Sequence, residues 1–115
     1  MENINVLKVE PGQTPEMIIM PNTLEAFQAA VGGYIEVLRL DANALLVCNE
    51  EGKLIDLPAN RQVDGDTIAG TFLIAGDEDG DCCSLSDADA AYYAERFAQP
   101  IPVPDGPTKW EFHVF

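Results

Sequence analysis

Residues 34–49 read YIEVLRL-DAN-ALLVCN, and this stretch decides the fold. Every second side chain from Tyr34 to Leu40 points to the same side of an extended chain, with the others on the opposite side. The six residues from Ala44 to Asn49 are almost all apolar, which is typical of a central strand buried on both faces. The short turn between the two segments therefore predicts an antiparallel pair of strands.

The chain before this pair predicts one strand and one helix. Residues 4–9 are rich in aliphatic and β-branched side chains and end at a Pro-Gly turn, so we expect a strand there. Residues 13–21 contain two prolines and predict an extended connection or a short edge strand. A helix is expected from an N-cap at Asn22 to Gly32-Gly33. Its apolar face comprises Leu24, Phe27 and Val31.

The chain after the pair predicts three strands and a second helix. The expected strands are a short one over 53–57, a strong one over 67–75 and a last one over 110–114. A loop over 58–66 and a polar loop over 76–83 flank the strong strand, and a helix runs from Ser84 or Ser86 to about Ala98. Together these elements predict one domain over residues 1–115 with the order β-α-β-β-β-α-β. The fold class is α+β, with an antiparallel sheet of four to five strands and both helices on one face.

The charge of the chain is strongly negative, at −14. Between residues 62 and 95 there is no Lys or Arg, but there are nine carboxylates: Asp64, Asp66, Asp77, Glu78, Asp79, Asp81, Asp87, Asp89 and Glu95. Such a field repels nucleic acid and attracts basic surfaces, so we expect no direct nucleic-acid binding. Two interpretations stay open, a solubilising surface and a face that imitates nucleic acid toward a basic partner.

The remaining composition narrows the class of protein. No apolar run is long enough for a membrane helix and the N-terminus does not resemble a signal peptide, so we expect a protein of the cytoplasm with no membrane partner. The three cysteines, Cys48, Cys82 and Cys83, are expected as free thiols. No cofactor or metal site is expected, because the only histidine is His113 and the acidic run 77–81 departs from a calcium loop at Cys82 and Ala88.

Catalytic motifs are missing from the sequence. There is no nucleophile elbow, phosphate-binding loop, dinucleotide fingerprint or zinc-protease motif, and a Cys-His pair would depend on His113 alone. We therefore expect a protein that is not an enzyme and has no catalytic residues.

Polar residues along the central strands and the following loop are the candidates for ligand binding. Arg61 is suited to two-point contact with a phosphate or carboxylate, the asparagines to a base edge, and Tyr34 to stacking. The candidate set is Tyr34, Arg39, Asn49, Asn60 and Arg61. A purely structural role is the alternative, with Asn49 stabilising a turn and Arg61 paired with Asp64 or Asp66.

Five segments in this order and spacing carry a resemblance to a known family: NTLEAFQ at 22–28, VGGYIE at 31–36, NEEGKL at 49–54, LPANR at 57–61 and DTIAGTF at 66–72. Over about residues 4–98 the chain resembles a family of small proteins with no established reaction, carried by phages, plasmids and conjugative elements, mostly of Gram-positive bacteria. The resemblance implies, by association, a role in overcoming host defence or in adjusting host physiology. It implies no catalytic residue.

These observations lead to a non-enzymatic anti-defence protein acting in the host cytoplasm, by one of two mechanisms. In the first, it sequesters a nucleotide-type immune signal, with Arg39, Asn60 and Arg61 holding phosphate and base. In the second, it covers a basic site on a host protein, using the face from 64 to 95 and above all Asp77, Glu78, Asp79 and Asp81. A nucleotide hydrolase is a lesser alternative. The apolar C-terminal segment is compatible with a homo-oligomer.

Overall fold

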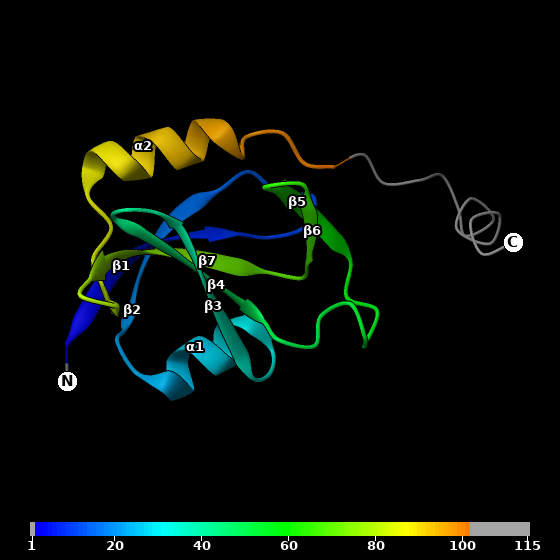
Figure 1. Ribbon diagram of the computed structural model, residues 1–115, viewed down its shortest axis with the longest axis horizontal. Helices are drawn as coiled ribbons and strands as arrows, with labels where there is room; N and C mark the ends of the chain where they lie inside the picture. Colours follow the sequence, from blue (N-terminus) through cyan, green and yellow to red (C-terminus); the bar gives the residue numbers. More distant parts are fainter. Residues whose placement is uncertain (1, 102–115) are drawn as a thin grey trace, which may run out of the picture.

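The expected pair of strands is present in the computed structural model, which describes residues 2–101 (Figure 1). Strand β3 (Ile35–Asp41) pairs antiparallel with β4 (Ala44–Asn49), in a register that runs from Ile35 opposite Asn49 to Asp41 opposite Ala44. The turn is closed by the backbone N–H of Asn43, which donates to Asp41 Oδ1 at 2.7 Å. The prediction of an antiparallel hairpin at this point is confirmed.

Strand β7 (Phe72–Glu78) lies at the centre of the main sheet. It pairs with β4 along one side, while β1 (Asn3–Val9) pairs with the first half of β7. The short strand β8 (Asp81–Cys83) pairs with the second half. Beyond β1 lies β2 (Glu16–Pro21), so that the order is β2-β1-β7-β4-β3 and every pairing is antiparallel. The α+β class with an antiparallel main sheet is confirmed.

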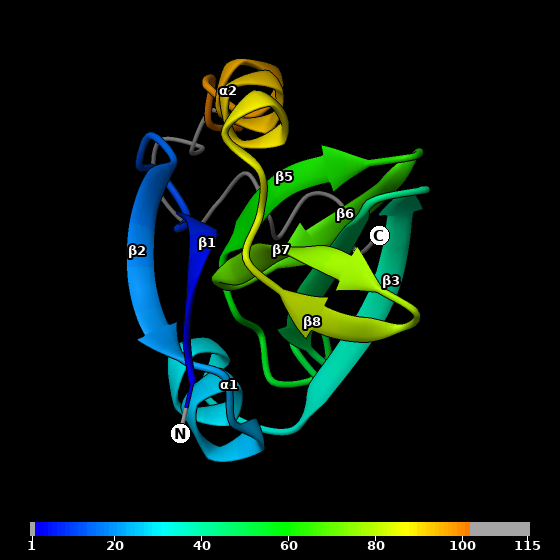
Figure 2. The same cartoon turned by 90° about the vertical axis from the view of Figure 1, so that its left-hand side faces the viewer.

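The two helices cover opposite faces of this sheet, which corrects the expectation that both lie on one face (Figures 1 and 2). Helix α1 (Leu24–Val31) buries Phe27 in a cluster with Val47 and Leu73. Helix α2 (Asp87–Arg96) buries Tyr93 in a cluster with Leu46 and Ile74. Because β4 and β7 are apolar on both sides, each face needs its own cover.

A second sheet is the hairpin of β5 (Ala59–Val63) and β6 (Asp66–Ala69). Strand β5 and the turn after it occupy the region predicted as a loop over 58–66, so that prediction is wrong for β5. Its two-residue turn has positive φ at Asp64 (50°) and Gly65 (83°), as type I′ hairpin turns require. Val63 and Ile68 join the core on the α2 side, so the hairpin completes the cover of that face.

The predicted strand over 67–75 is divided at Gly70 into β6 and β7. Gly70 has a φ of 83°, and a Cβ there would come within 2.7 Å of a side-chain carbon of Leu57. The chain can therefore turn from the small hairpin into the main sheet only at a residue without a side chain.

Several predicted boundaries need correction. The N-cap of α1 is Thr23, whose Oγ1 accepts from the N–H of Ala26, while Asn22 donates to Cys82 O at 3.0 Å. Leu24 is exposed and does not contribute to the core. The strand predicted over 53–57 is absent, since residues 53–56 form a turn and Leu57 lies in no regular element, and the polar loop over 76–83 is largely the β7–β8 hairpin. Helix α2 is capped by Ser86, and the strand predicted over 110–114 lies outside the described residues.

Helix α2 is linked to the β3–β4 turn by a hydrogen bond from the Tyr93 hydroxyl to Asp41 Oδ2. This bond is the main reason why the pKa of Asp41 lies below its usual value. Burial, followed by the same bond, raises the pKa of Tyr93. No helix within residues 2–101 is long and apolar enough to cross a membrane.

The raised pKa of Tyr93 predicts a loss of stability in alkali. Because the unfolded chain ionises this phenol from about pH 10 while the folded chain keeps it neutral, the contribution is complete below that pH and is lost as the pH rises toward the folded pKa. We expect Tyr93→Phe to lower the free energy of unfolding at neutral pH by about 1 kcal/mol and to flatten the alkaline decline. Urea unfolding across pH measures both effects.

Tyr92→Phe is the matched control, since Tyr92 is the neighbouring tyrosine of α2 and is exposed. It should leave both the neutral stability and the alkaline decline as in the parent. An equal alkaline decline in Tyr93→Phe and the parent would contradict the assignment to Tyr93.

Candidate functional site

Asn60 and Arg61, two of the predicted ligand-binding residues, lie in the interior. The Asn60 amide donates to the carbonyl oxygens of Val9 and Gly70, each at 2.8 Å, and its Oδ1 accepts from Arg61. The amide thereby joins β1 to the bend before β7. These contacts use the amide for the fold.

The Arg61 guanidinium connects three separate segments of backbone. Nε donates to Phe97 O at 2.9 Å, Nη1 to both oxygens of Asn60, and Nη2 to Gln13 O. The side chain is only 2% exposed, and burial lowers the pKa of Arg61. The carboxylates expected as its partners are bound elsewhere, with Asp66 paired to Lys53 and Asp64 to Arg96. Carbonyl oxygens therefore take the place that a ligand phosphate was expected to fill.

This geometry predicts that Arg61 acts in stability. Arg61→Ala leaves buried carbonyl oxygens without donors, and we expect the free energy of unfolding to fall by about 2–4 kcal/mol. Arg61→Lys should recover only part of the loss, because an ammonium cannot span the three segments. Chemical denaturation measures the change.

Lys53→Ala is the control for loss of a cation, because Lys53 forms an exposed ion pair with Asp66 at 2.5 Å. Such pairs contribute about 1 kcal/mol or less. If Arg61→Ala unfolded at the same denaturant concentration as the parent, the guanidinium would be free to serve a ligand instead.

Tyr34 and Asn49 line the same shallow hollow, which has a volume of about 280 Å³. Asn49 is buried and bridges two elements, because its Nδ2 donates to Val31 O at 3.1 Å and its Oδ1 accepts from the N–H of Glu51 at 2.8 Å. Tyr34 is 69% exposed. The charged residue of the hollow is Glu51, whose sign is unfavourable for a phosphate.

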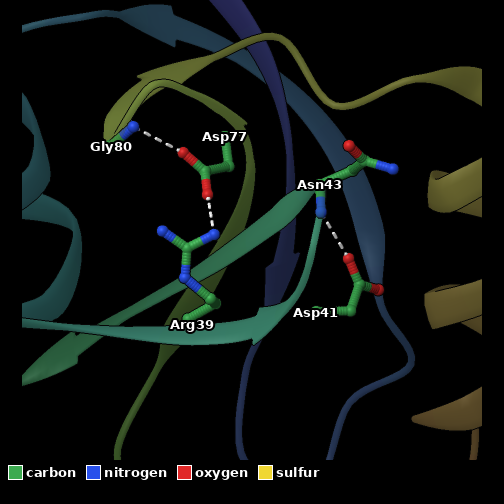
Figure 3. A network of polar contacts seen from close by, with 5 residues as sticks. All are labelled: Arg39, Asp41, Asn43, Asp77 and Gly80. Carbon is green, nitrogen blue, oxygen red and sulfur yellow. Dashed lines mark hydrogen bonds and ion pairs between the residues drawn. The ribbon is translucent and has the colours of Figure 1, made fainter.

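Arg39, the last predicted ligand residue, forms an ion pair with Asp77 on the central strand (Figure 3). Arg39 Nη1 and Asp77 Oδ2 are 2.6 Å apart, and Asp77 Oδ1 accepts from the N–H of Gly80 at 2.8 Å. The Asp77 side chain is only 3% exposed, so its carboxylate shapes the β7–β8 turn. The other three residues predicted for protein interaction, Glu78, Asp79 and Asp81, are exposed.

A groove of about 480 Å³ lies between the β7–β8 hairpin and the start of α1. Its carboxylates are Glu2, Glu78 and Asp81. Its apolar lining comprises Leu24, Phe27, Ile35 and Cys82, and the remaining lining residues are Asn22, Thr23 and Gly80. We call this feature the acidic groove. It contains two of the predicted interaction residues, Glu78 and Asp81. No sequence pattern indicates that Glu2, Leu24 and Ile35 share a site, because only the fold brings them together.

Every basic side chain within residues 2–101 has an ion-pair or hydrogen-bond partner within the protein. Lys8 pairs with Glu10 and Glu16, Arg39 with Asp77, Lys53 with Asp66 and Arg96 with Asp64, while Arg61 binds carbonyl oxygens. The carboxylates of the acidic groove have no ion-pair partner among these cations. The groove is therefore a site of unbalanced negative charge.

The cysteines are free thiols in the described part of the chain. Burial raises the pKa of Cys48 to about 11 and also raises the pKa values of Cys82 and Cys83. A thiol with a raised pKa is a poor nucleophile near neutral pH, so the geometry offers no activated cysteine here. Within residues 2–101 no group of three or more His, Cys, Asp or Glu side chains is arranged to hold a metal ion.

A family model described as a domain of unknown function, DUF3846, matches residues 4–98. The chain belongs to the DUF3846 family. The matched range spans the DUF3846 domain from β1 to α2, and includes every residue of the acidic groove except Glu2. No curated protein and no solved structure matches the chain.

Proposed function

We propose that this DUF3846 domain is a non-enzymatic binding protein that covers a basic site on another protein. The observation that carries the proposal is the acidic groove, in which Glu2, Glu78 and Asp81 surround an apolar floor and have no ion-pair partner among the described residues. An apolar floor with an acidic rim suits the stem and the charged head of a Lys or Arg side chain. Carboxylates are the natural partners of both heads.

The charge of the whole chain supports the same mechanism. With a net charge of −14 and the described cations neutralised internally, the long-range field is attractive to a basic surface. Such a field mainly raises the association rate and makes it sensitive to salt. The groove would then supply the short-range contacts that hold the complex.

The resemblance to proteins of phages and conjugative elements supports a host defence protein as the target. A defence protein that binds nucleic acid presents a basic surface of the kind that an acidic protein can occupy. The domain would act in the cytoplasm of the host, and its target would lose access to nucleic acid.

Sequestration of a nucleotide-type signal is the second candidate. The feature that favours it is exposed Tyr34 beside a hollow of about 280 Å³, where an aromatic ring can stack on a base. It has less support, because Arg39, Asn60 and Arg61 are bound to Asp77 and to the backbone and do not gather at that hollow. A nucleotide hydrolase has less support again, because the described residues offer no activated nucleophile.

Native mass spectrometry of the protein from infected, defence-positive cells identifies the occupant, and neutralising the groove tests the mechanism. We expect a stoichiometric host protein whose association rate falls steeply with ionic strength. Glu78→Gln with Asp81→Asn should weaken the complex by about tenfold or more, mainly through the association rate. Stopped-flow fluorescence over a salt series measures it.

The matched control is Asp87→Asn with Glu95→Gln, which also removes one Asp and one Glu charge. Both residues are exposed, Asp87 at the start of α2 and Glu95 near its end. It should change the affinity by about threefold or less, through the general field alone. A bound nucleotide in place of a protein would favour sequestration, turnover of that nucleotide would favour the hydrolase, and equal losses in both double variants would remove the groove from the mechanism.

A further inference from the structure

The turn between β4 and β5, residues 50–57, presents two large apolar side chains to solvent. Leu54 is 81% exposed and Ile55 is 54% exposed. Exposed Tyr34 lies beside Ile55, because the N–H of Glu50 donates to Tyr34 O at 2.9 Å and because Tyr34 and Ile55 line the same hollow. Leu54 lines the adjoining hollow, which shares Asn49 and Glu51 with the first. Single exposed apolar residues are ordinary, but three that line two adjoining hollows mark a candidate contact surface.

The exposure is a property of an ordered turn. Backbone N–H groups of Gly52, Ile55, Asp56 and Leu57 donate to carbonyl oxygens of Asn49, Glu51, Lys53 and Gly52, respectively. Gly52 is buried, and a Cβ there would come within 2.7 Å of Ala69 O, so the turn is packed closely against β6. A segment with this many internal bonds holds its outward side chains in place before any partner arrives.

Two further contacts fix the turn to the rest of the domain. The buried side chain of Asn49 bonds the end of α1 and the N–H of Glu51. Lys53 crosses to Asp66 on β6 at 2.5 Å. The turn is therefore anchored on both sides while Leu54 and Ile55 remain outside, which is the arrangement of a preorganised contact loop.

The charge around these side chains defines the partner. Glu50, Glu51 and Asp56 are exposed carboxylates of the same turn, and its one cation, Lys53, is already paired. An apolar centre with an acidic rim is complementary to a surface with an apolar centre and a basic rim. A second copy of this chain would bring the same carboxylates together, and an anionic membrane would face a chain of net charge −14.

We propose that Tyr34, Leu54 and Ile55 form a docking surface for a basic amphipathic segment of another protein. Apolar side chains of that segment seat on the three residues, and its Lys or Arg side chains face Glu50, Glu51 and Asp56. The contact uses an apolar anchor with a charged rim, the usual division between affinity and specificity in an interface.

This docking surface is separate from the acidic groove. The groove is lined by Leu24 and Phe27 in the first half of α1, whereas the hollow beside Tyr34 is lined by Gln28 in the second half and by Gly32, which follows the helix. The helix has eight residues and is about 12 Å long, so the two features lie beside different halves of one helix. The docking surface shares no residue with the groove, and each can be tested while the other is intact.

Titration of the isotope-labelled protein with a synthetic amphipathic helical peptide of Leu and Lys tests the proposal. We expect backbone amide signals of Tyr34 and residues 50–57 to shift most in the NMR spectrum. A peptide with Ser in place of every Leu carries the same charge and should bind at least about tenfold more weakly, because it lacks the apolar anchor.

The decisive variant is Leu54→Ser with Ile55→Ser, and its matched control is Met17→Ser with Ile19→Ser on the edge strand β2, where both side chains are also exposed. Because all four side chains are exposed, the far-ultraviolet circular dichroism and the unfolding midpoint should stay close to those of the parent. We expect the first pair to weaken binding of the Leu/Lys peptide about tenfold or more, and the control pair about twofold or less.

Three results would overturn the proposal. Equal affinity for the two peptides, with shifts confined to the acidic groove, would show binding by charge alone. Equal losses in the two double variants would show general adhesion to exposed apolar groups. Sedimentation of the free protein as a dimer that Leu54→Ser with Ile55→Ser dissociates would assign the docking surface to a second copy.

Discussion

Burial of the two central strands on both faces is the constraint on which the rest of the structure depends. All six residues of β4 are buried, as are the first five residues of β7. Because neither face of these strands can be left in water, the chain must supply two covers. Helix α1 covers one face, and α2 with the β5–β6 hairpin covers the other. The small hairpin and the second helix are therefore part of the core.

The second cover is joined to the sheet by polar contacts as well as by apolar ones. Arg61 binds the carbonyl oxygen of Phe97 at the end of α2 and that of Gln13 between β1 and β2, and Tyr93 binds Asp41 at the β3–β4 turn. Such bonds are directional, so they fix where the helix lies on a face whose apolar contacts alone would allow sliding. These contacts also explain why Arg61 forms no ion pair with Asp64 or Asp66, the carboxylates that follow it closely in the sequence.

The internal use of the cations determines the character of the surface. Lys8, Arg39, Lys53 and Arg96 are each paired with carboxylates, and Arg61 is buried. The remaining carboxylates have no ion-pair partner in the described part of the chain. Glu2, Glu78 and Asp81 line the acidic groove beside α1, and Glu51 lines the hollow on its other half. A helix that covers one face of the core thus also separates two acidic features, one a groove and the other a rim around apolar side chains. A partner of basic character is the common requirement of both.

The sequence by itself determined the strands with a clear pattern, the α+β class, the helix that ends at Gly32-Gly33, and the sign of the surface charge, because these follow from local periodicity and composition. The Asp64-Gly65 pair is a sequence signal for a two-residue hairpin turn, and both residues have positive φ in the structure, although a loop was predicted there. Only the tertiary structure decided that the helices lie on opposite faces and that Asn60 and Arg61 are interior. The local sequence around an arginine is the same whether its guanidinium is buried or binds a ligand. The difference is whether the fold brings distant carbonyl oxygens, here those of Gln13 and Phe97, within hydrogen-bonding distance.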